Sequence, residues 1–310
     1  MSEPQNLLEV KNLTTRFDLN EGVLSRPYAR VHAVEDISFE LKCGETLSLV
    51  GESGCGKTTT GRTILGLEKA TAGDIIFEGK SVLNYTRQER QGFCRSVQMI
   101  FQDPYSSLNP RMSVREILSE PIQVHKLHEG KAIENRVSDL LRYVNLKPEF
   151  ASRYPHEFSG GQRQRVSIAR ALALAPKLIV CDEAVSALDV TIKAQVINLL
   201  MDLQSEFNLS YLFISHDMAV VERISHRVAV MYLGRIVEIG PREAIFENPT
   251  HDYTKKLLSA VPVADPDLRR TERTLATDEI PSAVRALDYT PPAITYEQVA
   301  PKHFVAIEAA

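Results

Sequence analysis

The segment "GESGCGKTTT", residues 51–60, decides the fold of this chain. It places three glycines, one lysine and three threonines within ten residues. The preceding residues, Thr46–Val50, have the apolar content of a short buried strand, and residues 57–67 carry apolar side chains at helical spacing. The glycine-rich segment is therefore predicted to join a strand to a helix.

This loop fits the pattern G-x-x-x-x-G-K-[ST], with Gly51, Gly56, Lys57 and Thr58 at the fixed positions. The absence of side chains at glycine lets backbone N–H groups wrap a phosphate chain, and the helix N-terminus adds its positive dipole end. Lys57 is expected to reach the β- and γ-phosphates, and Thr58 to hold Mg²⁺. The pattern predicts a nucleoside triphosphate site, but it does not distinguish a kinase, a GTPase, a helicase and a transporter ATPase.

Composition limits the class of protein. The chain has 310 residues, 44% of them hydrophobic, which suits about two domains or one domain with an insertion. The net charge of −4 gives no reason to expect nucleic acid as a partner. The cysteines are widely spaced, at Cys43, Cys55, Cys94 and Cys181, which favours a reduced cytosolic protein. No window reaches the ~18 apolar residues of a membrane span, so a membrane role would come through partners.

The apolar pattern predicts alternating strands and helices, and hence an α/β core. Strands are expected at Leu8–Leu13, Ile37–Leu41, Asp74–Phe77, Val97–Phe101, 177–183 and 211–217, and a hairpin at 227–240 with its turn at Gly234. Helices are expected within 113–146, 159–175 and 190–207, which makes residues 103–175 a helical insert. A polar loop is expected at 20–30, and a tail of weak or irregular structure after Pro262.

The strand "KLIVCDE", residues 177–183, ends in two acids. An apolar strand that delivers an acid beside a phosphate-binding loop is a common way to hold Mg²⁺, here through Asp182 and a water molecule. Glu183 is then placed to polarise a water molecule for attack on the γ-phosphate. Without the upstream loop, the same two acids could simply be polar residues at a strand end.

The segment "FSGGQRQRVSIARAL", residues 158–172, begins a helix with Ser159, Gly160 and Gly161. Exposed N–H groups at this helix start could bind a second anion. An ordinary glycine cap before a basic amphipathic helix explains the same residues equally well.

Six motifs in order, spread over most of residues 6–262, resemble the ATP-binding cassette (ABC) family. They are the Walker A loop at 51–58, the Q-loop at Phe101 and Gln102, the signature "SGGQ" at 159–162, the Walker B strand at 178–183, the D-loop "SALD" at 186–189, and the switch histidine His216. The resemblance implies a P-loop NTPase of the ABC type, spanning residues 1–262. Such a domain has a RecA-like core, an antiparallel β subdomain and a helical subdomain.

The resemblance also implies roles for these residues. Two cassettes meet head to tail and bind ATP and Mg²⁺ between them. Each ATP is shared by two sets of residues: Gly51, Glu52, Ser53, Gly54, Cys55, Gly56, Lys57, Thr58 and Thr59 of one chain, and Ser159, Gly160, Gly161 and Gln162 of the other. Phe17, or alternatively Tyr28, would stack on adenine.

Catalysis is implied for Glu183, His216 and Gln102, and the metal contacts for Thr58, Gln102 and Asp182. Gln102 would also report to the membrane subunits, and His216 would contact the γ-phosphate. In the D-loop, which includes Ser186, Asp189 would signal across the dimer.

The segments "FQDPYSSLNPRMSV", residues 101–114, and "IFENPTHDYTKKLLSAVPVADP", residues 245–266, are similar to the oligopeptide/dipeptide/nickel importer subfamily. This similarity implies the ATPase subunit of a bacterial importer for peptides or related small polar solutes, held at the cytoplasmic face of the inner membrane. Its implied partners are a second ATPase chain, which is either this chain or a paralogue, and two transmembrane permeases. A periplasmic or lipid-anchored substrate-binding protein would act indirectly.

Residues 263–310 form a C-terminal extension that departs from many relatives. It contains no cysteine, so no iron–sulfur cluster is expected. Short stretches of it look like the tail of glutathione-importer ATPases, but the sequence does not name the solute. A soluble, non-transport ABC ATPase that assists a cytosolic enzyme complex, such as one for phosphonate breakdown, is the alternative. A P-loop kinase does not explain the signature and D-loop motifs.

Overall fold

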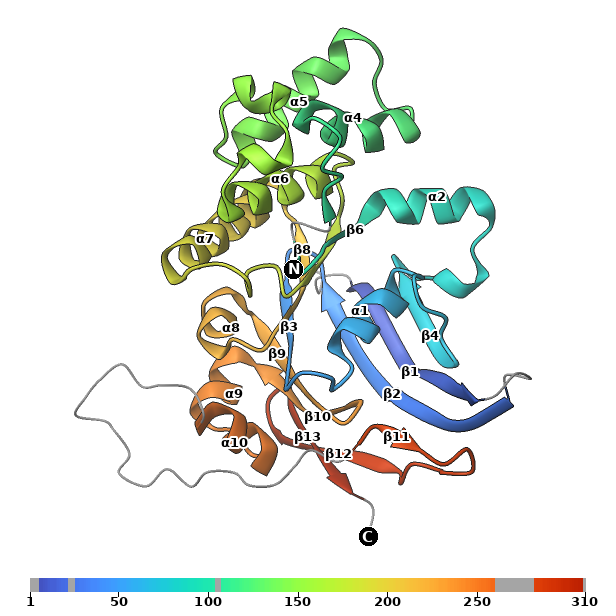
Figure 1. Ribbon diagram of the computed structural model, residues 1–310. Helices are drawn as coiled ribbons and strands as arrows, with labels where there is room; N and C mark the ends of the chain where they lie inside the picture. The colour runs from blue at the N-terminus through green and yellow to red at the C-terminus, as the bar shows by residue number, and fades with distance from the viewer. Residues whose placement is uncertain (1–5, 22–25, 104–106, 260–281, 309–310) are drawn as a thin grey trace, which may run out of the picture.

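The computed structural model describes residues 6–21, 26–103, 107–259 and 282–308. Figure 1 shows three regions: helices α4, α5 and α6 at one end, the antiparallel strands β1, β2 and β4 to one side, and a strand-and-helix body between them that continues to the C-terminal hairpin. No helix in the described part of the chain has the length and apolar character needed to cross a membrane. The α/β architecture expected from the sequence is confirmed.

The first sheet has the strand order β11-β2-β1-β4-β5. Its strands are β1 (Asn6–Glu21), β2 (Arg26–Lys42), β4 (Ala72–Phe77), β5 (Lys80–Ser81) and β11 (Val284–Arg285). Strands β1 and β2 are much longer than predicted, and they continue through most of the segment 20–30 that was expected to be a polar loop. Cross-strand pairing explains the difference, because Arg30 lies opposite Asp18 and donates to it at 2.5 Å. The residues at this exposed end of the sheet are polar, so the apolar pattern did not indicate that the two strands continue there.

The second sheet has the order β12-β13-β10-β9-β3-β8-β7-β6. Its parallel part comprises β3 (Thr46–Val50), β6 (Val97–Ile100), β7 (Leu178–Asp182), β8 (Ser210–Ser215) and β9 (Arg227–Tyr232). Strand β10 (Arg235–Pro241) returns antiparallel to β9 and completes the predicted hairpin. Strands β3, β7 and β8 are buried along their whole length, as expected for parallel strands covered on both faces.

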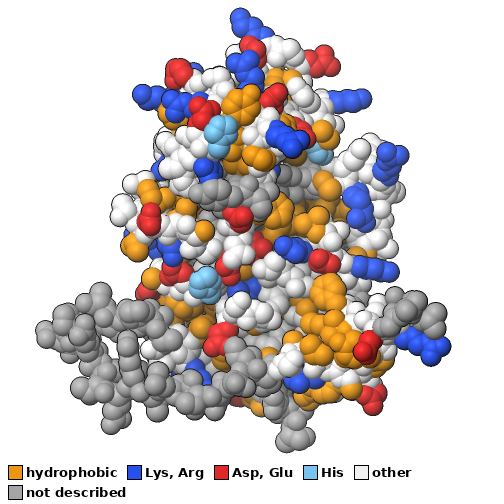
Figure 2. Space-filling view, viewed as in Figure 1, with side chains coloured by type: hydrophobic (Ala, Val, Ile, Leu, Met, Phe, Trp, Pro, Cys, Tyr) orange, Lys and Arg blue, Asp and Glu red, His pale blue; other side chains and the backbone are white. Residues whose placement is uncertain are grey.

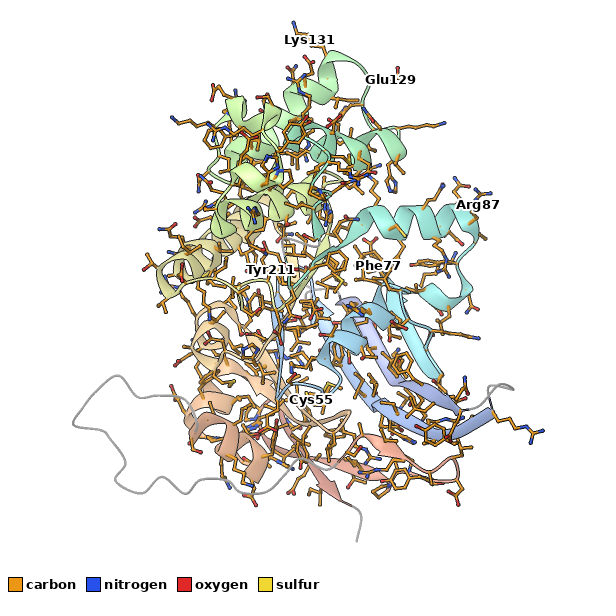
Figure 3. The ribbon with its side chains drawn as sticks, in the orientation of Figure 1. Cys55, Phe77, Arg87, Glu129, Lys131 and Tyr211 are labelled. Atoms are coloured by element: carbon orange, nitrogen blue, oxygen red, sulfur yellow. The ribbon has the colours of Figure 1, made fainter. Side chains whose placement is uncertain are left out.

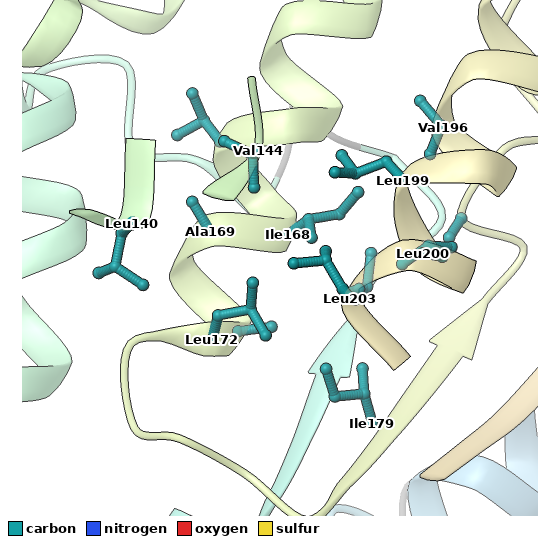
Figure 4. Packing of buried hydrophobic residues seen from close by; sticks show 14 of the residues in the cluster. Leu140, Val144, Ile168, Ala169, Leu172, Ile179, Val196, Leu199, Leu200 and Leu203 are labelled. Atoms are coloured by element: carbon teal, nitrogen blue, oxygen red, sulfur yellow. The ribbon is translucent and has the colours of Figure 1, made fainter. Parts of the chain in front are cut away.

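Helices cover this sheet and extend beyond it. They are α1 (Lys57–Ile64), α2 (Arg87–Ser96), α4 (Val114–Val124), α5 (Lys131–Tyr143), α6 (Gly160–Leu172), α7 (Val190–Phe207) and α8 (Met218–Ile224), with short 3₁₀ turns at Val82–Asn84, Pro148–Ser152 and Pro155–Glu157. Figure 4 shows Leu140 of α5, Ile168 of α6, Leu203 of α7 and Ile179 of β7 in one buried cluster. Tyr211, which Figure 3 labels, lies in the same cluster, and its hydroxyl donates to the Leu200 carbonyl at 2.9 Å. The helical insert therefore shares its core with the central sheet.

The end of the chain is more regular than expected. Helices α9 (Arg242–Glu247) and α10 (Asp252–Ser259) follow β10, and β12 (Ile294–Ala300) with β13 (His303–Glu308) forms a hairpin that adds to β10. The expectation of an irregular tail is therefore wrong for β11, β12 and β13, whereas residues 286–293 and 301–302 form turns and irregular chain. Pairing with β10, far away in the sequence, stabilises this hairpin, although its own apolar pattern is weak. The predicted domain boundary near residue 262 lies outside the described residues.

Candidate nucleotide-binding site

A cavity of about 750 Å³ lies at the carboxyl ends of the parallel strands. Ligands of open α/β sheets bind at this edge because several loops converge there. The cavity brings together residues that are distant in sequence: Phe17, Val31, Ala33, Gly51, Glu52, Ser53, Gly54, Gly56, Lys57, Thr58, Thr59, Gln102, Glu183, His216, Leu257 and Ala283. Nearly all the residues predicted to contact nucleotide on the same chain thus meet in one place.

Close packing around Gly56 restricts the backbone conformation of the Walker A loop. Gly56 has φ of 105°, and a Cβ atom there would lie 2.0 Å from the Ala33 carbonyl oxygen, so only glycine fits. Helix α1 begins directly after it, and no side chain caps this helix start. The first backbone N–H groups of the helix have no acceptor within the helix, and they can therefore bind a phosphate group.

Lys57 is 4% exposed. Its Nζ donates to the carbonyl oxygens of Gly51 at 2.8 Å and of Glu52 at 2.7 Å. These carbonyls solvate the buried ammonium group and fix its position within the loop. Cys55 lies beneath, with its Sγ 3.7 Å from Nζ, and burial raises the pKa of its thiol. Cys55 therefore acts as a small packing residue, while Lys57 supplies the positive charge.

Thr58 and Asp182 bring the Walker A and Walker B segments together. The Thr58 hydroxyl donates to Asp182 Oδ1 at 2.8 Å. Asp182 is 3% exposed, and burial raises the pKa of its carboxyl, an effect that the hydrogen bond from Thr58 opposes. A hydroxyl and a carboxylate are the hard oxygen donors that Mg²⁺ prefers. The donor set therefore fits the predicted metal.

Glu183, Gln102 and His216 form one cluster. Glu183 accepts a hydrogen bond from Gln102 Nε2 at 2.8 Å, and its other carboxylate oxygen lies 3.2 Å from His216 Nδ1. The backbone of Glu183 is in the left-handed region, with φ of 47°, and its N–H donates to the Ile214 carbonyl at 2.9 Å. A strained non-glycine residue at a strand end is typical of a functional site. In this conformation the Glu183 carboxylate contacts both Gln102 and His216.

The signature residues lie outside the residues that line this cavity. Ser159 is the N-cap of α6, and it forms a capping box with Gln162. A Cβ atom on Gly161 would lie 2.5 Å from Ile192 Cγ2 of α7, so this glycine permits close packing of the two helices. The Ser159 side chain is exposed. Its predicted contact with the ATP of a second chain stays a prediction.

The D-loop connects the cavity to the signature segment. The Ser186 hydroxyl donates to the Glu183 carbonyl at 3.0 Å, and Leu188 packs close to Gly160. Asp189 is the N-cap residue of α7 and makes no side-chain capping bond. Contacts of Ser186 and Leu188 thus connect Glu183 with the start of α6.

Phe17 of β1 lines the cavity and is 37% exposed, whereas Tyr28 is 56% exposed and is absent from the lining residues. The position of Phe17 favours it over Tyr28 for adenine stacking, which stays a prediction. Four other residues that line the cavity were not predicted from the sequence: Val31, Ala33, Leu257 and Ala283. Leu257 belongs to the segment 245–266 that resembles the importer subfamily, but this resemblance assigns it no role, and no local signal marks Ala283 in the tail.

Two family models match the chain. One, described as "ABC transporter", covers residues 34–186, and the other, described as "Oligopeptide/dipeptide transporter, C-terminal region", covers residues 237–286. The chain belongs to the ABC transporter family. The predicted resemblance is thereby confirmed, including its importer subfamily. In this family the cavity described above is the candidate ATP site.

Curated relatives support the same family. The chain is 58% identical over 300 residues to the glutathione import ATP-binding protein GsiA of Pectobacterium atrosepticum, and 58% identical over 300 residues to GsiA of Escherichia coli strain K12. In both cases the match covers 97% of this chain and 48% of the relative. The chain thus spans about half the length of these relatives.

Solved structures agree with the fold. CbiO1 from Clostridium perfringens, part of the ABC transporter complex CbiONQ, has a TM-score of 0.67 at 26% identity, with 78% of this chain and 91% of that chain covered. The cassette MJ0796, solved as a dimer in a post-hydrolysis state with ADP and Pi, has a TM-score of 0.66 at 26% identity, covering 76% and 98%. The expected ABC-type fold class is confirmed.

Proposed function

We propose that this chain is the ATP-hydrolysing, energy-coupling part of an importer for peptides or related small polar solutes, with a glutathione-type solute as the leading case. The observation that carries the proposal is the contact of Glu183 with Gln102 and His216 beside the Walker A loop. The match of residues 237–286 to the oligopeptide/dipeptide transporter C-terminal region directs the proposal to this class of importer.

In the proposed reaction, the N–H groups of the Walker A loop bind the phosphate chain and Lys57 neutralises part of its charge. Thr58, Asp182 and Gln102 would hold Mg²⁺, which would supply charge stabilisation at the phosphoryl oxygens. Glu183 would orient a water molecule and take its proton. The water oxygen bonds to the γ-phosphorus while the bond from that phosphorus to the β,γ-bridging oxygen breaks, and ADP leaves. His216, 3.2 Å from Glu183 in this structure, turns toward the γ-phosphate and holds it in line with the water molecule.

A second cassette is part of the proposal, because Ser159, Gly160, Gly161 and Gln162 lie outside the residues that line the cavity of their own chain. They would complete the ATP site of a partner chain, and ATP binding would close the pair while hydrolysis opens it. The dimer of MJ0796 supports this arrangement. Two permeases would receive the motion at the cytoplasmic face of the inner membrane, and a substrate-binding protein would supply the solute.

A soluble, non-transport ATPase is the less favoured alternative. The relatives that match almost the whole of this chain are named for glutathione import, and the C-terminal match is to transporters. In Figure 2, basic and acidic side chains are interspersed over the visible face, so this face carries no extended patch of one sign of charge.

Affinity purification tests the proposal. A tagged Glu183→Gln chain is purified from detergent-solubilised membranes with ATP and Mg²⁺, and mass spectrometry identifies its partners. The variant should keep ATP bound in the closed state and recover two multi-spanning proteins. The matched Lys57→Ala variant should lose ATP and fail to trap this state. Recovery of soluble enzymes alone by both variants would contradict the importer proposal and favour the alternative.

A further inference from the structure

The region after β10 reaches the proposed nucleotide site through helix α10. Tyr253 in the first turn of this helix is 9% exposed, and its hydroxyl accepts a hydrogen bond from the backbone N–H of Glu52 at 3.0 Å. Its ring packs on Tyr232, with 4.3 Å between the ring centroids. A tyrosine from the C-terminal region therefore contacts the second residue of the Walker A loop directly.

The peptide that joins Gly51 to Glu52 is held from both sides. Its N–H donates to the Tyr253 hydroxyl, and its carbonyl oxygen accepts from Lys57 Nζ at 2.8 Å. The N–H and C=O of a planar trans peptide point in opposite directions, so fixing the N–H also fixes where the carbonyl points. Tyr253 thereby sets the position of the acceptor that holds the Lys57 ammonium group.

Tyr253 is itself held by the fold around it. The buried carboxylate of Glu238 accepts from the backbone N–H of Thr250 at 2.8 Å and of His251 at 3.1 Å. The Tyr253 N–H donates to His251 Nδ1 at 3.1 Å. Glu238 also lies 2.7 Å from His303 Nε2 of β13. These bonds connect the position of the Tyr253 hydroxyl to β10 and to the C-terminal hairpin.

Other residues of the C-terminal region line the same cavity. Leu257 lies four residues after Tyr253, on the same face of α10. Ala283 lies beside β2, where its carbonyl accepts from the His32 N–H at 3.0 Å, and β11 continues this pairing. The described residues on both sides of segment 260–281 thus border the candidate ATP site.

We propose that Tyr253 is a positioning residue for the ATP site, acting through the peptide between Gly51 and Glu52 on Lys57. The inference rests on the proposed function, because it assigns a role within the same site. It makes the C-terminal region part of the nucleotide-binding apparatus. A change in the packing of that region would alter ATP affinity more than it would alter the chemistry at Glu183.

The test compares two tyrosine variants of the full chain. Tyr253→Phe removes only the hydroxyl and keeps the ring packed on Tyr232. The control is Tyr296→Phe in β12, which removes a hydroxyl that donates to the Ile236 carbonyl at 2.8 Å, within the same region but outside the residues that line the cavity. Thermal unfolding of both variants checks that each is folded. The readouts are the Kd for ATP with Mg²⁺, and KM and kcat for ATP hydrolysis.

Tyr253→Phe should raise the Kd and KM for ATP about fivefold, the change expected from one neutral hydrogen bond. Its kcat should stay within about twofold of wild type, because Glu183 is untouched. Tyr296→Phe should change none of the three constants. Equal effects in the two variants, unchanged ATP affinity in Tyr253→Phe, or a loss confined to kcat would overturn the positioning role. Failure of the wild-type chain to bind ATP would instead overturn the proposed function.

Discussion

Gln102 Nε2 donates to Glu183 Oε2 at 2.8 Å, across 81 positions of the sequence. The residue expected to report to membrane subunits therefore orients the carboxylate expected to activate water. This contact couples the two roles, because movement of Gln102 changes the direction of the Glu183 carboxylate. A permease that displaces Gln102 would in this way control hydrolysis.

Gln102→Ala should lower kcat for ATP hydrolysis about tenfold, because a misdirected general base loses part of its ~10²–10⁴-fold contribution. ATP affinity should change little, since Lys57 and the Walker A loop are intact. The comparison variant is Gln98→Ala. Gln98 lies on β6, which ends two residues before Gln102, and its side-chain amide donates to the Cys94 carbonyl. Equal turnover in the two variants would remove Gln102 from this role.

Asp182→Asn should stabilise the chain at neutral pH in the absence of Mg²⁺ and nucleotide. Burial raises the pKa of Asp182 above its ordinary value of 3.8, so the charged form is disfavoured in the folded state. The stability that this group contributes is present below pH 3.8 and is lost as the pH rises through the folded pKa. Asparagine carries no charge at any pH, so the variant does not lose this stability as the pH rises.

The measurement is Tm against pH for wild type and Asp182→Asn. The gain in Tm should be largest near pH 7 and should shrink as the pH falls. At pH 7 the variant should also lose the extra stability that Mg²⁺ and ATP give the wild type, because a metal ligand is missing. A constant difference in Tm across the pH range would contradict the assigned cause.

Gly161→Ala should destabilise the chain by about 1–3 kcal/mol, the usual range for overpacking. The added Cβ would lie 2.5 Å from Ile192 Cγ2, and a β-branched side chain has little freedom to move aside. Gly160→Ala is the matched control, because its Cβ would meet Leu188 Cδ2 at an ordinary 3.8 Å. Urea unfolding measures both, and a second change, Ile192→Ala, should rescue the first variant. Equal stability of the two alanine variants would disprove the packing argument.

Elements set by local sequence could be predicted closely. Strand Thr46–Val50 and helix Val190–Phe207 have the boundaries expected from their apolar patterns. The C-terminal hairpin could not be predicted, because β13 is fixed by pairing with β10 and by the buried contact between His303 and Glu238. Such pairing depends on residues that are remote in the sequence.

The candidate site likewise contains residues that could be predicted from the sequence and residues that could not. The Walker A residues could be identified because their spacing within one loop is dictated by the phosphate chain they bind. The contact of Tyr253 with Glu52 spans 201 positions, and nothing near Tyr253 in the sequence indicates its partner. Ala283 was missed for the same reason, since only its pairing with β2 brings it to the cavity.

Glu238→Gln should lower the free energy of unfolding by about 1–3 kcal/mol, the cost of leaving a buried hydrogen-bonding group unpaired. Both carboxylate oxygens of Glu238 accept backbone N–H groups, from Thr250 and His251. Glutamine replaces one of these oxygens with a donor. The exposed Glu243→Gln is the control, and it should change stability by less than ~0.5 kcal/mol.

Urea unfolding measures the two glutamine variants, and hydrogen exchange follows the amides of residues 250–259. Exchange should become faster there in Glu238→Gln and stay unchanged in Glu243→Gln, because only the first loosens the loop that carries Tyr253. ATP affinity should fall together with this protection, since Tyr253 then no longer fixes the peptide before Glu52. Faster exchange with unaltered ATP affinity would show that loosening the C-terminal region does not affect ATP binding. That result would contradict the positioning role of Tyr253.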